Sequence, residues 1–256
     1  MRNSSGAGAL DLMIRSFALE QIMAARTNTQ ADILPARRKA PPAEQEYEQF
    51  QSLADAAAAV DECRRCPLYK LATQAVFGEG PERADVMFVG EQPGDKEDLA
   101  GRPFVGPAGQ VFDEIVKKVG IDRSRVYVTN AVKHFKFTPR GKRRIHQKPD
   151  NGEIEACRFW LDLERHFVQP KIVVALGGTA VRSLLGRTIP ISRLRGQPVN
   201  LEDRSVLYVT NHPSYLLRIP DAEGKARERA KFAADLELVK THMDRLEKSP
   251  RPRRSA

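Results

Sequence analysis

The sequence predicts a three-layer α/β/α sandwich with a four-stranded, mainly parallel central sheet. Four runs of five or six residues are rich in apolar, β-branched and aromatic residues and are too short for helices. Runs that are almost continuously apolar fit strands buried on both faces, as in parallel sheets. Helical patterns separate these runs, and strands that alternate with helices are typical of the α/β class.

The expected elements follow in order along the chain. The runs DVMFV, RVYVT, KIVVAL and SVLYVT predict strands at residues 85–89, 125–129, 171–176 and 205–210. Helical patterns predict helices at residues 107–119, 151–168, 178–186 and 225–246. We expect one folded domain over residues 46–246. Two tails are expected to flank it, a disordered or partly helical one over residues 1–45 and a basic disordered one over residues 247–256.

Composition narrows the classes of function. The 256 residues include 42 Lys and Arg against 33 Asp and Glu, which gives a net charge of +9 and a pI near 9.6. This balance indicates an anionic partner. No window approaches the ~18 uninterrupted apolar residues of a membrane span. Three cysteines are too few for a disulfide framework, so we expect a cytoplasmic protein. It is expected to be a monomer that joins the nucleoid when it acts.

Polar segments rich in Gly and Pro follow the predicted strands. In chain order, these segments are GEQPGD, NAVKH, GGT and NHPS. Ligands of open parallel sheets bind at the carboxyl ends of the strands. All α/β proteins have polar loops, but Glu91, Asn130 and His212 in three separate loops favour a functional site at this edge.

The residues at this edge suit cleavage of a glycosidic bond. A carboxylate such as Glu91 can stabilise an oxocarbenium-like centre or orient a nucleophile, and His212 can hydrogen-bond the departing group. The Asn130 amide both donates and accepts, so it can read the edge of a base. Phe104, in the loop GRPFVGP, can stack on a base or pack in the core, and the sequence leaves both options open.

The three cysteines suggest a metal site. Cys63 and Cys66 form a CxxC motif, and Cys157 lies in a predicted helix. A thioredoxin-like redox pair would follow a strand, whereas an Ala-rich helical stretch precedes this motif. A closed tetrahedral site needs a fourth ligand, and His134 is the best candidate among five histidines. A redox pair and three unrelated buried thiols remain alternatives, as does the choice between zinc and an iron–sulfur cluster.

A basic loop follows the second predicted strand. Residues 133–148 hold seven Lys and Arg, no acid and two interleaved phenylalanines. Charge runs are usually solvated faces, but the position of this loop at the candidate edge favours contacts with a phosphate backbone. Within the loop, the segment KRRIH ends at His146. Flanking cations disfavour imidazolium, so we expect this histidine to be neutral and nucleophilic at physiological pH.

Together these motifs resemble the uracil-DNA glycosylase superfamily, and specifically its iron–sulfur branch. Over roughly residues 50–245, GEQPG is similar to the first catalytic motif, GRPFVGPAG to the base-stacking loop, TNAVKH to the base-reading strand end and NHPS to the leucine-loop motif. The segments CRRC and ACRFW resemble the cluster-binding segments. Several independent motifs in the family's order argue against a chance match. The resemblance implies the uracil-DNA glycosylase fold.

Two departures from the ordinary family-four pattern resemble the UdgX-type uracil-DNA cross-linking proteins. His134 stands where ordinary members carry Cys, and the segment GKRRIHQKP is similar to an insertion typical of the UdgX group. The first motif also carries Gln92 in place of a small residue. In UdgX proteins, the histidine of the insertion attacks C1′ of the deoxyribose after uracil leaves. The resemblance therefore implies a single-turnover protein that ends as a covalent DNA adduct.

The resemblance also implies a role for each candidate residue. The catalytic residues would be Glu91, Arg144, His146 and His212. Uracil would be bound by Gly90, Gln92, Asp95, Phe104 and Asn130, and the DNA backbone by Lys136, Arg140, Lys142, Arg143 and Ser214. A [4Fe–4S] cluster would be held by Cys63, Cys66, His134 and Cys157.

The expected partner is uracil-containing DNA, single-stranded or double-stranded, in DNA repair. The expected reaction flips the nucleotide out of the stack, cleaves the N-glycosidic bond and leaves a His–C1′ adduct. One alternative is a conventional turnover uracil-DNA glycosylase of base-excision repair. Another is a metal-stabilised DNA-binding module without chemistry. The combination of Glu91, Asn130 and His212 argues against such a module, because phosphate binding needs none of them.

Overall fold

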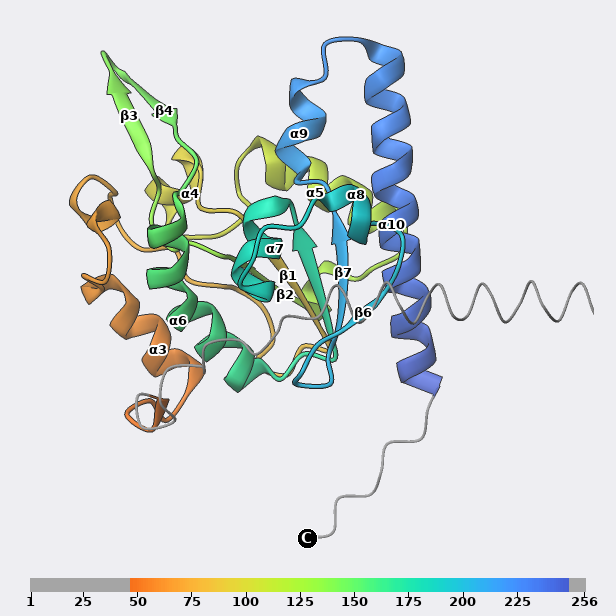
Figure 1. Ribbon diagram of the computed structural model, residues 1–256, viewed down its shortest axis with the longest axis horizontal. Coiled ribbons are helices and arrows are strands. Elements are labelled where there is room, and N and C mark those ends of the chain that lie inside the picture. Colours follow the sequence, from red (N-terminus) through yellow and green to blue (C-terminus); the bar gives the residue numbers. More distant parts are fainter. Residues whose placement is uncertain (1–46, 249–256) are drawn as a thin grey trace, which may run out of the picture. The chain divides into compact units, whose positions relative to one another are not determined.

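The computed structural model describes residues 47–248 of the chain. A five-stranded sheet lies at its centre, with the strand order β2-β1-β5-β7-β6 (Figure 1). Four strands are parallel, and β6 pairs antiparallel with β7. The strands are β1 (Val86–Gly90), β2 (Val126–Asn130), β5 (Ile172–Leu176), β6 (Val199–Asn200) and β7 (Val206–Thr210).

Helices cover both faces of this sheet. The α-helices are α3 (Leu53–Ala59), α4 (Asp95–Ala100), α5 (Pro107–Lys118), α6 (Asn151–Val168), α7 (Gly178–Leu185), α8 (Ile191–Leu194), α9 (Pro213–Arg218) and α10 (Ala222–Lys248). Short 3-10 helices lie at η1 (Val60–Glu62), η2 (Pro67–Lys70) and η3 (Arg123–Arg125). Helices α5 and α10 pack on one face, and α6 and α7 pack on the other. The expected α/β/α layers are therefore present.

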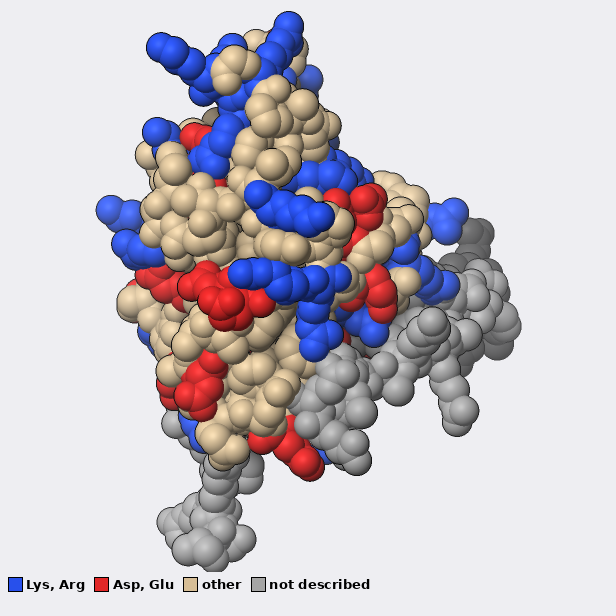
Figure 2. All heavy atoms as spheres, turned by 90° about the vertical axis from the view of Figure 1, so that its left-hand side faces the viewer, with Lys and Arg blue, Asp and Glu red and all other residues tan. Residues whose placement is uncertain are grey.

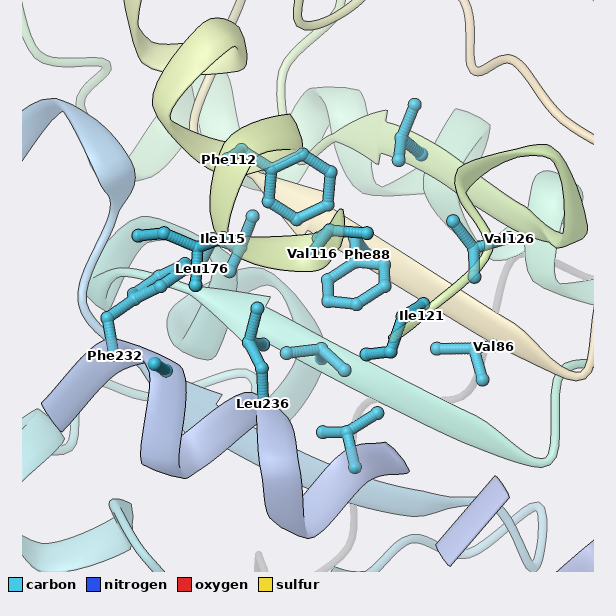
Figure 3. Close-up of a cluster of buried hydrophobic side chains, with 14 of the residues drawn as sticks. Val86, Phe88, Phe112, Ile115, Val116, Ile121, Val126, Leu176, Phe232 and Leu236 are labelled. Atoms are coloured by element: carbon cyan, nitrogen blue, oxygen red, sulfur yellow. The ribbon is translucent and has the colours of Figure 1, made fainter. Parts of the chain in front are cut away.

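A core cluster of buried side chains lies between the sheet and helices α5 and α10 (Figure 3). Alternate side chains of a strand point to opposite faces, so Val86 and Phe88 of β1 both face this layer. Phe88 packs edge-to-face against Phe112 of α5, with ring centroids 4.9 Å apart. From α10, Phe232 and Leu236 close the cluster, and both are fully buried. This packing holds β1 rigidly, and β1 leads directly into the candidate site.

The predicted strands and long helices agree closely with the structure, but the sheet has five strands and not four. The additional strand, β6, has only two residues and lies at the edge of the sheet. A second difference is a two-stranded hairpin, β3 (Phe137–Arg140) and β4 (Arg143–His146), within the expected basic loop. Helix α10 also continues to Lys248, so the first residues assigned to the C-terminal tail are helical.

The N-terminal tail expected over residues 1–45, residue 46 of the expected domain, and residues 249–256 of the C-terminal tail lie outside the described residues. Within residues 47–248, no helix combines the length and apolar character that crossing a membrane requires.

The topology gathers four strand ends at one edge of the sheet. Because β1, β2, β5 and β7 are parallel, their carboxyl ends all open on that edge. The β3–β4 hairpin follows β2 and projects from the rest of the fold (Figure 1). The loops that follow these strands and the hairpin are therefore close enough to build one site.

Candidate active site

A cavity of about 850 Å³ lies at the carboxyl ends of the parallel strands. The loops after β1, β2, β5 and β7 all line it, and so does the end of the β3–β4 hairpin. The structure brings together most of the expected site residues here, namely Glu91, Gln92, Asp95, Phe104, Asn130, His146, His212 and Ser214.

Asn130 and Phe104 converge above the end of β1. A Cβ atom added to Gly90 would lie 2.3 Å from Asn130 Oδ1 and 2.9 Å from the Phe104 ring, so this position has no room for a side chain. Because Gly90 has no side chain, Asn130 and the Phe104 ring can approach the backbone at this position. Phe104 adopts a left-handed backbone conformation with φ of 58°, which is costly for a residue other than glycine and typical of functional sites. Its ring packs against Phe112 and also lines the cavity, so both roles left open by the sequence apply.

His212 is held as a neutral hydrogen-bond donor. Its Nδ1 accepts the backbone N–H of Ser214 at 3.2 Å, as the N-cap of α9. A neutral imidazole with an accepting Nδ1 carries its proton on Nε2. Burial lowers the pKa of His212 to about 4, and the positive charge of Arg218 adds to the shift. The Ser214 hydroxyl, expected at a phosphate, instead bonds to His212 Nδ1 at 2.8 Å and so helps to fix this tautomer.

Glu91 lies between a hydroxyl and an imidazole. Its Oε2 accepts a hydrogen bond from Thr179 Oγ1 at 2.5 Å, and its Oε1 lies 3.5 Å from His146 Nε2. Thr179 is the second residue of α7. The sequence indicated it only as part of the polar segment GGT, because a threonine in a loop gives no chemical signal of its own.

Gln92 holds the base of the hairpin. Its Oε1 accepts from the backbone N–H of Lys136 at 3.0 Å, and its Nε2 donates to the carbonyl of Gln147 at 2.9 Å. The same Nε2 lies 2.9 Å from His146 Nε2. The side chain is buried, with 6% of its surface exposed. The sequence assigned Gln92 to uracil, whereas the structure uses its amide to hold the residues on either side of the hairpin.

Arg144 anchors the hairpin from the side. Its Nε donates to Asp95 Oδ1 at 2.6 Å, and its Nη1 donates to Asp98 and to Thr73. Its guanidinium also lies 5.2 Å from the centroid of the Phe137 ring. Asp95, expected to bind uracil, lines the cavity, and its carboxylate forms an ion pair with Arg144. Arg144, expected among the catalytic residues, thus holds the hairpin in place through these contacts.

The pKa of His146 is lowered, as expected, but for a different reason. Burial lowers it most, the Glu91 carboxylate opposes the shift, and Arg218 lowers it further. The sequence attributed the shift to the flanking cations of the loop. Asp95 and Asp98 neutralise Arg144, which explains why that neighbour contributes little.

The comparisons with known proteins agree with this geometry. Residues 77–237 match the family described as the uracil DNA glycosylase superfamily. This chain belongs to that superfamily. Type-4 uracil-DNA glycosylases are similar to it over most of their length. The one from Thermotoga maritima is 39% identical over 160 residues, which are 62% of this chain and 80% of that protein.

Two archaeal relatives extend the comparison. The type-4 uracil-DNA glycosylase of Sulfurisphaera tokodaii is 35% identical over 185 residues, 69% of this chain and 81% of that protein. The one from Pyrobaculum aerophilum is 36% identical over 173 residues, 65% of this chain and 85% of that protein. The superfamily match begins at residue 77, so Cys63 and Cys66 lie before it.

The thiols of this superfamily member suit an iron–sulfur cluster. Cys63 directly follows η1, Cys66 directly precedes η2, and Cys157 lies on α6. The pKa of Cys157 is raised to about 12, chiefly by burial and in part by the charges of Cys66 and Cys63, so the three thiols lie near one another. Two N–H groups point at the sulfurs, Trp160 Nε1 at Cys63 and the Lys133 backbone at Cys157, each at 3.1 Å. Such bonds tune cluster thiolates.

The fourth candidate ligand, His134, lies on the segment before the hairpin. Among residues 47–248, no three His, Cys, Asp or Glu side chains converge closely enough to hold one metal ion, as a tetrahedral zinc site requires. His134 is buried, and burial lowers its pKa, which favours the neutral imidazole that a metal needs. Its pKa also responds to Asp61 and Arg64, which are close to Cys63 in the chain.

Two of the basic-loop residues are bound within the protein. Lys136 pairs with Glu153 at 2.8 Å and with Asp150 at 3.3 Å, so it braces the N-terminus of α6. Lys133 is fully buried, and its ammonium donates to Glu164 Oε2 at 2.7 Å. Lys133 was not among the residues expected to bind the DNA backbone, and its burial excludes such a contact, whereas Lys136 was expected to bind it and is instead paired with two carboxylates.

The buried Lys133 instead braces the strand end that carries Asn130. Its ammonium also donates to Thr129 Oγ1 at 2.6 Å and to the Asn130 carbonyl at 2.8 Å. On the far side of the pair, Glu164 accepts from the Gly78 backbone at 2.8 Å. No pattern in the sequence distinguished this lysine from its exposed neighbours.

The tip of the hairpin is exposed and cationic, and the exposed Lys96 and Arg218 line the cavity itself. Arg140, Lys142 and Arg143 are exposed, and none has an ion-pair partner within the described part of the chain. Figure 2 shows Lys and Arg side chains extending outward at the top of the view, where the hairpin faces the viewer. These residues remain the candidates for contacts with the DNA backbone.

Proposed function

We propose that this chain excises uracil from DNA and is then captured by the substrate through a covalent bond from His146 to C1′. Membership of the superfamily supports the excision step. The observation that supports capture is the place of His146, whose Nε2 lies in the cavity 3.5 Å from Glu91 Oε1. A nucleophile at that point reaches the sugar carbon that uracil leaves.

Excision uses the residues at the strand ends. The nucleotide flips into the cavity, at a cost of a few kcal/mol. Phe104 stacks on the base, and the Asn130 amide bonds to its edge. The C1′–N1 bond then breaks, and its electron pair leaves with uracil as an N1 anion. The Nε2–H of His212 donates to uracil O2 and stabilises that negative charge.

Capture needs a lone pair on His146 Nε2, and the hydrogen bonds of Gln92 favour the tautomer that has one. The Lys136 N–H can only donate, which fixes Gln92 Oε1 as its acceptor and Gln92 Nε2 as a donor. Gln92 Nε2 lies 2.9 Å from His146 Nε2, so that ring nitrogen accepts and is unprotonated. The lone pair attacks C1′ and forms the N–C1′ bond. The ring then loses its Nδ1 proton, and the uracil anion takes a proton from water.

Glu91 contributes charge to both steps. At 3.5 Å from an accepting Nε2, its Oε1 cannot take a proton from that nitrogen. Its negative charge instead stabilises the cationic sugar and then the cationic imidazole of the new adduct. Covalent catalysis of this kind becomes a dead end, because uracil has diffused away and no group displaces the imidazole.

The cluster residues play a structural part in this proposal. Cys63, Cys66, His134 and Cys157 would hold the [4Fe–4S] cluster, which when bound cross-links η1, α6 and the segment before the hairpin. Fixing that segment lowers the entropy lost when the hairpin holds His146 against the sugar.

A denaturing gel tests the proposal directly. Wild-type protein mixed with single-stranded uracil-DNA should give a shifted, heat-stable band. His146→Ala should give none and should release uracil with turnover, because water then reaches C1′. His242→Ala is the matched control, since that histidine bonds to Tyr208 and does not line the cavity. Free abasic DNA from the wild type would identify a conventional turnover glycosylase, and a cross-linking His146→Ala would exclude this nucleophile.

A further inference from the structure

Thr179 has an unusual place for a buried hydroxyl. Only 2% of its surface is exposed, and its Oγ1 donates to Glu91 Oε2 at 2.5 Å. It lies at the start of α7, directly after the loop in which Gly177 approaches His212. A Cβ atom on Gly177 would lie 3.2 Å from His212 Cβ. The beginning of α7 is therefore close to two residues of the proposed chemistry.

This hydrogen bond is the restraint on an otherwise free carboxylate. Glu91 follows the last residue of β1, and its backbone carbonyl accepts from Val132. Its side chain has several rotatable bonds and is a quarter exposed, at 24%. Within the described part of the chain, Thr179 makes the one side-chain hydrogen bond recorded for that carboxylate. The other oxygen is thereby directed toward His146 and the cavity.

We propose that Thr179 is a positioning residue that holds the Glu91 carboxylate where positive charge develops at C1′. The inference rests on the excision chemistry proposed above. It does not depend on whether His146 or water captures the sugar. A displacement of about 1 Å in a group that stabilises charge can cost roughly 100-fold in rate, so a single hydroxyl has a measurable effect.

Three variants separate positioning from packing. Thr179→Val removes the hydroxyl at nearly constant volume, and Thr179→Ser keeps the hydroxyl but loses the methyl group. Ser183→Ala is the matched control, because Ser183 is a buried hydroxyl on the same helix. Its Oγ has no hydrogen-bond partner among residues 47–248.

The measurements are the single-turnover rate of uracil release from single-stranded uracil-DNA and the affinity for a slow analogue. The analogue is the same strand with 2′-fluoro-2′-deoxyuridine, whose fluorine disfavours positive charge at C1′. Thr179→Val should slow release by about 10- to 100-fold and leave affinity within about twofold. Thr179→Ser should restore most of the rate, and Ser183→Ala should match the wild type.

Each result bears on the inference. Wild-type rate in Thr179→Val overturns it. So does equal loss in the Val and Ser variants, which would mean that packing matters and the hydroxyl does not. Adduct formation is scored on the same samples, so a wild type that releases uracil without cross-linking refutes capture alone. A wild type that releases no uracil refutes both proposals.

Discussion

The two parts of the candidate site are built in opposite ways. The strand-end part carries Glu91, Asn130 and His212 at the carboxyl ends of a largely buried parallel sheet. The hairpin part carries His146 on two short strands whose residues are mostly exposed. Side chains, chiefly Gln92 and Arg144, hold the second part against the first.

This difference separates recognition from the fate of the product. In the strand-end part, a change at one residue disturbs packed neighbours and the groups that read or release the base. In the hairpin part, a change alters which nucleophile meets the sugar after uracil has left. The predictions below test that division, beginning with the largest expected effect.

Asn130→Ala should nearly abolish uracil release. A site built to hydrogen-bond a base leaves its own polar groups unpaired when that bond is lost, which costs roughly 10⁴-fold in the related case of a missing substrate group. We expect a loss of at least about 1,000-fold in the single-turnover rate. A hairpin variant, Arg140→Ala, serves as the control and should release uracil at the normal rate. Equal rates for Asn130→Ala and the wild type would remove that residue from the site.

Stability should show the same division. Lys133→Met leaves the buried Glu164 carboxylate without its partner and should lower the free energy of unfolding by about 3–5 kcal/mol. Lys142→Met at the hairpin tip should change it by less than about 0.5 kcal/mol, because that side chain is exposed. Urea unfolding of the full chain measures both. Similar losses in the two variants would contradict the proposed contrast.

Lowering the pH should affect capture before excision. Protonation removes the His146 lone pair and so stops attack on C1′. His212 stays neutral to a lower pH, because burial lowers its pKa to about 4, whereas His146 is half exposed. Burial also lowers the pKa of His146, so the share of covalent product should fall as the pH drops below the ordinary histidine range, while uracil release continues until His212 is protonated near pH 4. Products quantified on one gel across this range would refute the idea if both declined in parallel.

The smallest effect concerns salt. Each phosphate contact contributes roughly one unit to the slope of log affinity against log salt. Replacing Arg140 and Lys142 by Ala should therefore flatten the slope by up to about two units without changing which base is released. Lys136→Ala should leave the slope unchanged, since Glu153 and Asp150 already hold that ammonium. Fluorescence anisotropy at several salt concentrations tests this, and a strong effect of Lys136→Ala would argue against it.

The sheet and its long helices could be predicted because burial imposes a pattern on the sequence. Strands buried on both faces need apolar residues throughout, and α6 or α10 are long enough to repeat their amphipathic pattern. Strand β6 has two residues and leaves no periodic signal. The hairpin escaped prediction because its strands are exposed and charged, so no buried face requires alternation.

The site residues show a different limit. Residue type and position at a strand end were enough to bring Glu91, Asn130 and His212 into one prediction. The direction of a side chain cannot be read from a sequence. Gln92 and Asp95 are predicted to bind uracil and do line the cavity, but their side chains also bond to the hairpin. A sequence carries the chemistry of a side chain but not where that side chain points.

Hydrogen bonds close the base of the hairpin, where the chain leaves the rest of the fold and returns to it. The Gln147 N–H donates to the Lys136 carbonyl at 2.9 Å, and the Gln92 amide bonds to the backbones of both residues. The two ends of the hairpin, Lys136 and Gln147, are thus joined before the hairpin begins. Because residues 136 and 147 already meet, a change in the length of the tip leaves both ends of the hairpin in place, whereas loss of Arg144 would remove the ion-pair partner of the buried Asp98. The same hydrogen-bonded base can therefore support a hairpin tip of another length.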